Sequence, residues 1–469
     1  MKKNILLIYP PIDKDYYIEG VNDSPPLGLV ALQNYICRKS QLPVKVDIID
    51  GEYSNLEKIL SVIRTSNYEL IGIQPMMASY RSTLRILEEA KKFKIMTAIG
   101  GHHATNLAQQ IIKKRNLLID FIILGDGEVA LTGLIKEESP YTLPNLMFYD
   151  KSAEKIICTN LQNVPLEDGK IDFIDEQVLN QYKNTNNKKL ERGQELISFR
   201  LYSHKGCSNR LNSQYCYFCG RADKGVRFKT PQDYIDELLY LSNMPNAEYI
   251  FEIGDDFLQD MDWLNKVCDL KEKTIKDDSI KLKIFARANR ITPSVIPILK
   301  RLNIDEVAIG FESGSARILK NINKNATPSD NMEAAQLLFS HGIDTIASFV
   351  LGLPGEDTIS LEETYNQAME LRELSFKYLG KGPQEIIANL IEINPGSPAF
   401  RQLQSHYPKY LHEDDIRVKQ AQDDYFKMIF GLQTIEEVEL LRNNFVQWGK
   451  KINKLGNYTY PAGWVKGEI

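Results

Sequence analysis

The sequence has no long hydrophobic run, few cysteines and almost no excess of charge. None of its apolar stretches approaches the roughly 20 residues of a membrane-spanning helix. The start, Met1–Lys3 followed by apolar Ile5–Ile8, resembles a signal peptide, but Asp13–Asp15 closes the short run without a cleavage site. With 57 basic and 62 acidic residues, the net charge of -5 gives no general attraction to nucleic acid. We therefore expect a cytoplasmic protein with neither a membrane nor a nucleic acid as its partner.

The cysteine content also excludes a disulfide framework, since only six cysteines are spread over 469 residues. The overall composition, 43% hydrophobic and 25% charged, is that of an ordinary globular chain with room for two or three domains. Cys37, Cys158 and Cys268 stand alone on helix or hairpin patterns that predict plain burial. The other three cysteines fall within residues 207–219, and this clustering is the first chemical signal.

Residues 1–136 alternate short apolar runs with amphipathic stretches. This pattern predicts an α/β domain with a doubly wound parallel sheet of the flavodoxin-like (Rossmann-like) kind. The predicted strands are Ile5–Tyr9, Val44–Ile49, Leu70–Gln74, Met96–Ile99 and Phe121–Leu124. The predicted helices are Leu27–Cys37, Leu56–Ile63, Arg81–Phe93, Asn106–Ile112 and Val129–Ile135. Open α/β sheets bind ligands at the carboxyl ends of their strands, so we expect a binding crevice there.

The rest of the chain divides into three parts. Residues 137–195 predict a linker that contains a β-hairpin, Asn145–Tyr149 against Lys155–Thr159. Residues 196–396 hold a second β-α series, whose six successive units predict a partial (β/α)6 barrel. Its predicted strands are Ser198–His204, Glu248–Ile253, Lys281–Ala286, Glu306–Gly310, Thr345–Leu351 and Glu385–Ile391. Residues 397–469 are mostly helical in pattern.

The clustered cysteines come directly after a predicted strand. Cys207 is followed by eight residues and then by Cys216 and Cys219 in a Cys-x-x-Cys turn. Three thiolates can hold three irons of a [4Fe–4S] cluster and leave the fourth iron for a small molecule. A structural zinc site needs four protein ligands, and His204 could supply the fourth. On spacing alone, zinc and simple packing of free thiols stay open as alternatives.

Further short motifs follow in a fixed order along the chain. The first domain contains Ser24–Leu29 (SPPLGL), Gly100–Thr105 (GGHHAT) and Gly125–Glu128 (GDGE); the second contains Gly254–Phe257 (GDDF), Ile309–Ser315 (IGFESGS), Leu351–Glu356 (LGLPGE) and Asn394–Pro398 (NPGSP). By these motifs the sequence resembles the radical S-adenosylmethionine (radical SAM) superfamily, in its branch with an N-terminal cobalamin-binding domain, over roughly residues 1–396. That family usually has three residues where this chain has eight between Cys207 and Cys216. A loop accepts such an insertion at modest entropic cost.

The resemblance implies that Cys207, Cys216 and Cys219 ligate a [4Fe–4S] cluster, whose free iron binds the methionine part of SAM. Reduction of the cluster then cleaves SAM to a 5′-deoxyadenosyl radical. The implied SAM contacts are Phe218, Val350, Leu351 and Ile391 along the adenine, Gly254, Asp255 and Asp256 near the ammonium group, Arg287 near the carboxylate, and Glu312 with Ser313 near the ribose or ammonium group. The alternatives are a capped helix start for the Gly254–Asp256 segment and a mutual ion pair between Arg287 and Glu312.

For cobalamin, the resemblance implies a site at the strand ends of the first domain. None of the six histidines has an aspartate two residues before it, so ligation by Asp-x-His-x-x-Gly is absent. The lower face of the cobalt is then left to the loop Gln74–Tyr80. The candidate contacts are Pro25, Leu27, Gln74, Met76, Ser79, Gly100, Gly101, His102, Gly125, Asp126, Gly127 and Glu128. Ordinary packing of Met76 and a degenerate domain that binds no cobalamin are the alternatives.

With both cofactors, the resemblance implies cobalamin-dependent methylation of an unactivated carbon. The alternatives are a radical SAM enzyme that catalyses epimerisation or ring rearrangement without methylation, and a cobalamin or iron–sulfur sensor that does not cleave SAM. A methylthiotransferase would need three more clustered cysteines in the first domain, which holds only Cys37. The implied partners are a reductant protein, such as a flavodoxin or ferredoxin, and a small-molecule or peptide substrate. The sequence marks neither the substrate nor a catalytic residue.

Overall fold

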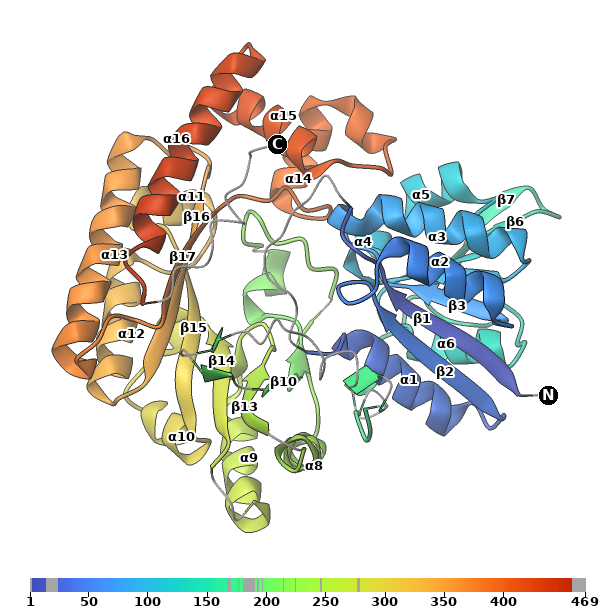
Figure 1. Ribbon diagram of the computed structural model, residues 1–469. Coiled ribbons are helices and arrows are strands. Elements are labelled where there is room, and N and C mark those ends of the chain that lie inside the picture. The colour runs from blue at the N-terminus through green and yellow to red at the C-terminus, as the bar shows by residue number, and fades with distance from the viewer. Residues whose placement is uncertain are drawn as a thin grey trace.

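Two α/β domains lie side by side, and a helical C-terminal segment extends across the top of both (Figure 1). This arrangement comes from a computed structural model, in which the last residues of the predicted C-terminal segment, 458–469, lie outside the described part of the chain. The structure describes residues 2–13, 24–166, 170–174, 176, 178–179, 190–191, 194–195, 197–213, 215–223, 225–244, 247–275 and 279–457. Within these residues, no helix has both the length and the apolar character needed to cross a membrane.

The first domain is built on a sheet whose described strands run in the order β2-β1-β3-β4-β5-β6-β7. Strands β1 to β5 pair in parallel, and their side chains are buried because helices cover both faces. The strands are β1 Lys3–Tyr9, β2 Val44–Asp50, β3 Leu70–Ile73, β4 Met96–Ile99, β5 Phe121–Ile123, β6 Leu146–Asp150 and β7 Lys155–Cys158. The helices are α1 Leu27–Lys39, α2 Leu56–Thr65, α3 Tyr80–Lys92, α4 Gly101–Asn106, α5 Ala108–Arg115 and α6 Glu128–Ile135.

Two local details differ from the sequence prediction. The hairpin β6-β7, placed in the linker by its sequence, pairs antiparallel with β5 and forms the edge of the first sheet. The single helix predicted over Asn106–Ile112 is wrong. The backbone at Leu107 leaves helical geometry (φ -111°, ψ 15°) and separates α4 from α5. Helix α4 can therefore begin directly after β4 and direct its side chains toward the second domain.

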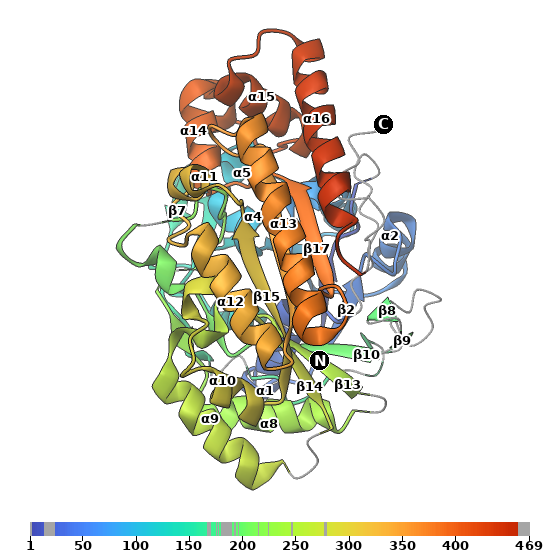
Figure 2. The same cartoon turned by 90° about the vertical axis from the view of Figure 1, so that its left-hand side faces the viewer.

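The second domain is a parallel sheet in the sequential order β10-β13-β14-β15-β16-β17. Figure 2 shows α12, α13 and α16 covering the outer face of this curved sheet. The strands are β10 Ile197–Leu201, β13 Ala247–Glu252, β14 Lys281–Ala286, β15 Ile304–Glu312, β16 Asp344–Leu351 and β17 Glu385–Leu390. The helices are α8 Pro231–Ser242, α9 Met261–Thr274, α10 Ile296–Arg301, α11 Ala316–Asn321, α12 Pro328–Ser340 and α13 Thr358–Leu379. The predicted fold class, a Rossmann-like domain followed by a partial barrel, is confirmed.

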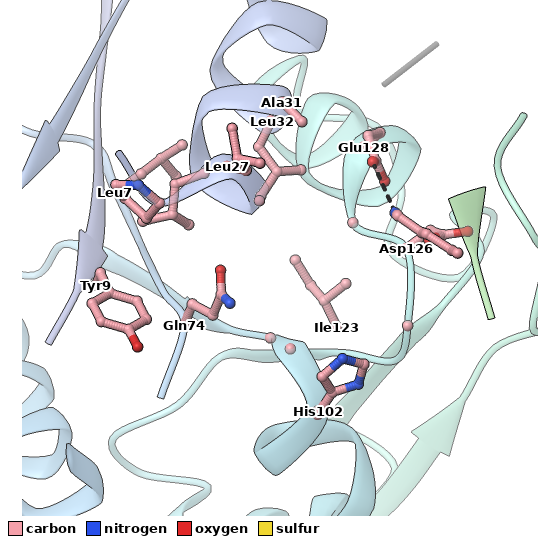
Figure 3. Close-up of a pocket in the computed structure, with 18 of the residues that line it drawn as sticks. Leu7, Tyr9, Leu27, Ala31, Leu32, Gln74, His102, Ile123, Asp126 and Glu128 are labelled. Atoms are coloured by element: carbon pink, nitrogen blue, oxygen red, sulfur yellow. Dashed lines mark hydrogen bonds and ion pairs between the residues drawn. The ribbon is translucent and has the colours of Figure 1, made fainter. Parts of the chain in front are cut away.

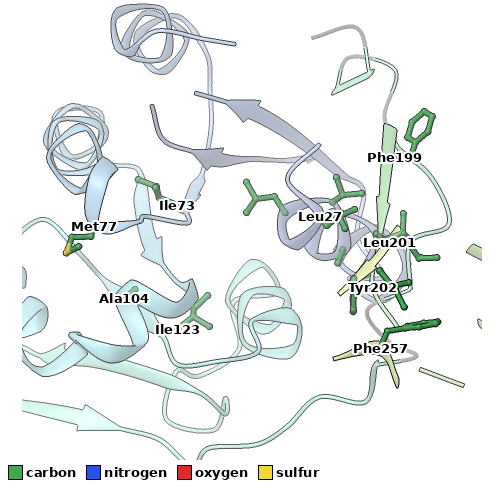
Figure 4. Close-up of a cluster of buried hydrophobic side chains, with 14 of the residues drawn as sticks. Leu27, Ile73, Met77, Ala104, Ile123, Phe199, Leu201, Tyr202 and Phe257 are labelled. Atoms are coloured by element: carbon green, nitrogen blue, oxygen red, sulfur yellow. The ribbon is translucent and has the colours of Figure 1, made fainter. Parts of the chain in front are cut away.

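The apolar core continues from one domain into the other. Figure 4 draws members of one buried cluster from both: Leu27 and Ile123 of the first domain, and Phe199, Leu201 and Phe257 of the second. Burial of apolar surface stabilises at roughly 25 cal/mol per Å². Because this surface is shared, the two domains stabilise each other and their strand ends are held at a fixed separation.

The C-terminal helices α14 Pro398–His406, α15 Val418–Phe430 and α16 Ile435–Asn453 connect the two domains from above. Helix α16 packs on β17 and α13. The loop before α15 contacts the first domain through Asp414, which is fully buried and accepts hydrogen bonds from the Tyr80 hydroxyl (2.9 Å) and the Arg115 guanidinium (2.6 Å). Arg81 pairs with the neighbouring Asp415 at 3.1 Å.

Replacing Tyr80 with phenylalanine is expected to lower the free energy of unfolding by about 1.5–3 kcal/mol, the usual contribution of a buried hydrogen bond to a charged group. Tyr141→Phe is the matched control, because Tyr141 is 55% exposed and also donates its hydroxyl to an aspartate, Asp150. We expect less than about 0.5 kcal/mol there. Denaturant titration measures both, and equal losses would contradict a special role for the Tyr80–Asp414 contact.

Candidate functional site

The cysteine segment lies between two short strands, β11 His204–Lys205 and β12 Arg227–Phe228, that pair antiparallel at the end of β10. This pairing explains why the strand predicted over Ser198–His204 ends at Leu201. Gly206 has φ +97°, and a Cβ there would lie 1.9 Å from the carbonyl oxygen of Gly225. Only glycine fits at position 206, where the two strands approach so closely. The loop that carries the cysteines leaves and returns at this contact.

Two of the three clustered cysteines have a side-chain N–H group within hydrogen-bond distance of the sulfur. The Asn209 amide lies 3.2 Å from Cys216 Sγ, and a guanidinium N–H of Arg210 lies 3.7 Å from Cys219 Sγ. Arg287 adds a longer contact to Cys216 at 3.9 Å. Hydrogen bonds and positive charge around the sulfurs favour the thiolate form that binds metal. Burial acts in the opposite direction at Cys207, where it raises the thiol pKa.

His204 is not arranged as a zinc ligand. Its ring is buried against Phe228, its Nε2 accepts a hydrogen bond from the Asp256 amide (3.3 Å), and its Nδ1 contacts the Ser203 hydroxyl (2.7 Å). Burial lowers its pKa to about 4, so it stays neutral. Across the described residues, no group of three or more His, Cys, Asp or Glu side chains is placed to share a single metal ion. The contacts of His204 therefore favour three thiols that each bind a different iron over one four-ligand zinc site.

The two aspartates that follow β13, Asp255 and Asp256, differ in their partners. Asp255 pairs with two arginines, Arg210 at 2.6 Å and Arg221 at 3.1 Å. Asp256 is completely buried. Its oxygens accept no close, well-aligned hydrogen bond from the described residues, and the nearest cation, Arg290, lies 3.6 Å away. Burial raises its pKa. Asp256 does not cap a helix either, because Asp260 caps α9 instead. The capped-helix alternative is therefore wrong for Asp256, whose carboxylate has capacity for a cationic ligand.

The mutual ion pair considered for Arg287 and Glu312 does not form. Glu312 pairs with Lys324 Nζ at 2.6 Å, and Arg287 donates to the backbone carbonyl of Lys324 and points toward Cys216. Glu312 also has φ +61°, which is uncommon for a residue with a side chain. Ser313 is fully buried and contacts the Thr364 hydroxyl at 3.2 Å. Strain of this kind concentrates at functional sites.

The last two strands supply an apolar wall. Leu351 and Ile391 are buried, the Ile391 amide donates to the Leu351 carbonyl (2.8 Å), and Val350 is half-buried. Gly352 follows with φ +88°, where a Cβ would lie 2.7 Å from the Phe426 ring. Phe218 is half-buried beside Cys219 and packs against the core. Leu351 and Ile391 are almost completely covered by the protein, so Val350 and Phe218 keep the accessible apolar surface of this set.

A cavity of about 380 Å³ lies between the two domains (Figure 3). Its first-domain wall includes Pro25, Leu27, Gln74, Gly100, Gly101, His102, Gly125, Asp126, Gly127 and Glu128, and its second-domain wall includes Arg200, Tyr202, His204, Lys205, Arg221 and Asp255. All the cobalamin candidates except Met76 and Ser79 thus line this cavity. Of the SAM candidates only Asp255 lines it, and the three clustered cysteines do not. Tyr9, which ends the strand predicted over Ile5–Tyr9, also lines the cavity. The sequence did not indicate Arg200, Tyr202 or Arg221, because a distance between domains has no signature in a local pattern.

Met76 and Ser79 turn away from this cavity. The Met76 sulfur accepts a hydrogen bond from the Tyr9 hydroxyl (3.0 Å), and the buried Ser79 hydroxyl accepts one from the Met76 amide (3.0 Å). The Met76 sulfur is therefore engaged by β1 and the Ser79 hydroxyl by the loop itself, and only Gln74 of that loop lines the cavity. Gln74 lies close to Gly28 and Gly101, where a Cβ would come within 3.1 Å and 3.0 Å of its side chain.

The GDGE motif carries an ion cluster that joins the domains. Asp126 pairs with Lys205 at 2.9 Å and with Arg227 at 2.7 Å, and it accepts the Val164 amide at 2.9 Å. Burial alone would raise the pKa of Asp126, but these cations outweigh it and hold the pKa below its usual range. Glu128 lies 3.7 Å from Lys205. Asp126 therefore fixes the loop that leads into the cysteine segment.

Helix α4 makes a second connection between the domains. His102 accepts a hydrogen bond from the Ala222 amide (3.1 Å) and contacts Arg221 (3.2 Å). Asn106 donates to the carbonyl oxygens of Gly220 (2.7 Å) and Pro395 (2.8 Å). The GGHHAT motif thus touches the cavity on one side and the segment after Cys219 on the other.

Comparison with known families decides between these interpretations. Residues 201–368 match the family model of the radical SAM superfamily, and residues 14–135 match that of the B12-binding domain. The chain joins a B12-binding domain to a radical SAM domain. It is therefore a cobalamin-dependent radical SAM enzyme, and this family implies a [4Fe–4S] cluster, SAM and cobalamin as cofactors. The three thiols, the buried Asp256 carboxylate and the cavity between the domains fit these groups.

Relatives of known name are distant. An uncharacterized methyltransferase of Pyrococcus horikoshii is 23% identical over 390 residues, which is 78% of each chain. An anaerobic magnesium-protoporphyrin IX monomethyl ester cyclase of Rubrivivax gelatinosus is 25% identical over 386 residues, covering 78% of this chain and 65% of the cyclase.

Two solved structures share the fold of this chain. The cobalamin-dependent enzyme OxsB superposes with a TM-score of 0.66 at 18% identity, over 88% of this chain and 62% of OxsB. The methyltransferase TsrM from Kitasatospora setae superposes with a TM-score of 0.65 at 14% identity, over 86% of this chain and 76% of TsrM. Both matches extend across the two domains.

Two of the isolated cysteines differ from the sequence prediction. Cys37 and Cys158 are exposed, whereas Cys268 is buried as expected. Cys37 lies near the end of α1, on its solvent side, and Cys158 ends the edge strand β7. None of the three lines the cavity between the domains.

Proposed function

We propose that this enzyme transfers a methyl group from SAM, by way of cobalamin, to an unactivated carbon of a small-molecule or peptide substrate. The observation that carries the proposal is the cavity between the domains, because the strand ends of the first domain border it together with the ends of β10 and β13 of the second. A group bound by the glycine motifs therefore faces Asp255 and Gly206, the residue before Cys207. The cofactors supply the methyl group and the radical. The chain's own residues set the distance between them and limit the access of water.

Each polar group has a defined part in this arrangement. The buried Asp256 carboxylate, which has Arg290 at 3.6 Å and accepts no close hydrogen bond from the described residues, suits the SAM ammonium group. Glu312 is held by Lys324, and Asp255 by Arg210 and Arg221, so these carboxylates contribute orientation more than free charge. Val350 and Phe218 offer apolar surface to the adenine. Electrons reach the cluster from a protein donor such as a flavodoxin or ferredoxin.

Ring formation without methylation is the second candidate. Support comes from two relatives whose names describe other reactions: the cyclase noted above and a 4′-phospho-dehydrooxetanocin synthase of Priestia megaterium, 24% identical over 354 residues, which are 69% of this chain and 45% of the synthase. A sensor, the third candidate, would leave SAM intact.

The deciding experiment is anaerobic reconstitution with iron, sulfide and cobalamin, followed by incubation with SAM, dithionite and a small-molecule extract as the substrate pool. About four irons per chain are expected. Methyl transfer predicts S-adenosylhomocysteine and 5′-deoxyadenosine in similar amounts, with label from methyl-deuterated SAM in a product. 5′-Deoxyadenosine without S-adenosylhomocysteine would favour the ring-forming reaction, and intact SAM would favour a sensor.

Cobalamin binding can be tested at Gly101. Replacing it with alanine places a Cβ 3.0 Å from Gln74 Cγ at a backbone with φ +83°, so we expect the Kd for cobalamin to rise about tenfold, together with a strain of about 1–2 kcal/mol. Gly380→Ala is the control, since Gly380 has φ +70° and open space around it. Absorbance titration should show unchanged affinity in the control. Equal affinities in both variants would exclude Gly101 from the cobalamin site.

A further inference from the structure

The eight residues between Cys207 and Cys216 have so far no function. They begin with the short helical turn Ser208–Ser213. Two contacts fix its start: the Ser208 amide donates to Gln259 (2.9 Å), and the Ser208 hydroxyl accepts from Arg290 (3.0 Å). The Arg210 amide donates to the Cys207 carbonyl at 2.9 Å. The turn is therefore attached both to the barrel and to the first cysteine.

This turn places two side-chain donors on the other cysteines. Asn209 has a fixed orientation, because its Oδ1 accepts from Asn325 (2.7 Å) while its Nδ2 donates to Cys216 Sγ (3.2 Å). Arg210 is buried, and its pair with Asp255 (2.6 Å) orients a second N–H toward Cys219 Sγ at 3.7 Å.

We propose that Asn209 and Arg210 are positioning residues that raise the reduction potential of the [4Fe–4S] cluster. One-electron reduction takes the cluster core from +2 to +1, and the electron comes from an external donor such as dithionite or a reduced flavodoxin. No bond forms or breaks in this step. N–H groups on the sulfurs and a buried cation stabilise the more negative reduced form, so the cluster accepts an electron more readily. The proposal depends on the cluster and not on methyl transfer.

Arg210→Met is the decisive variant, and Arg221→Met is its matched control. Both remove one positive charge and one partner of Asp255, but the contacts of Arg221 go to Asp255 and His102, whereas Arg210 also reaches a cysteine sulfur. In a redox titration followed by EPR, we expect the ratio of reduced to oxidised cluster at a fixed potential to fall about tenfold in Arg210→Met, which corresponds to about 59 mV for one electron. The control should change by less than threefold.

Asn209→Leu removes the second donor without changing the charge, and a fall of about threefold is expected. Arg210→Lys keeps the charge. Iron and sulfide are measured for each protein, so a variant that has lost its cluster is recognised before its potential is compared. If Arg210→Met fails to bind a cluster, Asn209→Leu decides. An unchanged potential in Asn209→Leu and in an Arg210→Met protein that binds its cluster, or equal shifts in Arg210→Met and Arg221→Met, would overturn the proposal. The predicted shifts in potential without any methylated product would count against the proposed methyl transfer alone.

Discussion

Cys216→Ala is expected to remove SAM cleavage completely, with at least a thousandfold loss of 5′-deoxyadenosine formation and a fall in iron well below the roughly four atoms of a full cluster. Cys216 is buried, and it receives N–H groups from Asn209 and Arg287, so its loss takes away a thiolate at a place that water cannot fill. Because the cluster supplies the electron that breaks SAM, no other residue compensates. Iron analysis and chromatography of the nucleoside products measure the two effects.

Cys158→Ala is the matched control, since Cys158 is exposed at the end of β7 and its thiol makes a weak contact with the Thr159 carbonyl at 3.8 Å. Iron content and SAM cleavage should both stay within twofold of the parent. A Cys216→Ala protein that still binds a full cluster would show that another residue serves as the third ligand, and His204 would then be the first to replace.

Asp126→Asn is expected to cost about 3 kcal/mol in the free energy of unfolding, because it leaves the half-buried Lys205 and Arg227 without their closest counter-charge, while Glu128 stays 3.7 Å from Lys205. The asparagine keeps an oxygen for the Val164 amide, so the loss reports the charge. Denaturant unfolding at neutral pH measures it. Glu69→Gln is the control, since Glu69 pairs with Lys3 on the surface, and a loss below about 1 kcal/mol is expected there.

The pH dependence of that effect has a definite sign. The folded pKa of Asp126 lies below its usual range, so the carboxylate stabilises the fold at every pH above the ordinary range for aspartate. The contribution disappears as the pH falls through the lowered pKa. The difference between the parent and Asp126→Asn should therefore shrink in acid, and a difference that stays constant down to pH 3 would contradict the ion cluster.

The sequence predicted the strands well because buried parallel strands are continuous apolar runs. Ile5–Tyr9 and Leu70–Gln74 were found to within two residues for this reason. The glycine motifs were informative for a related reason: Gly101 and Gly352 have backbone angles that other residues avoid, so the motif records the turn itself.

Partners across space could not be predicted in the same way. Glu312 pairs with Lys324, twelve residues further on, and Asp126 with Lys205 and Arg227 of the other domain. Such pairs depend on how the domains dock, and nothing in a local pattern records the docking. The same holds for Met76, whose contact with the Tyr9 hydroxyl is set by the path of the loop.

The contacts of Asn106 determine when, during synthesis, the two domains can dock. Its amide joins the carbonyl of Gly220 to that of Pro395, which is 289 residues away along the chain. Ribosomes add about 5–20 residues per second, so the first domain leaves the ribosome roughly 15–60 s before this contact can form. During that interval its apolar face toward the second domain is open to water. Chaperones that bind nascent chains are expected to protect this face, and domain docking is expected to be the last step of folding.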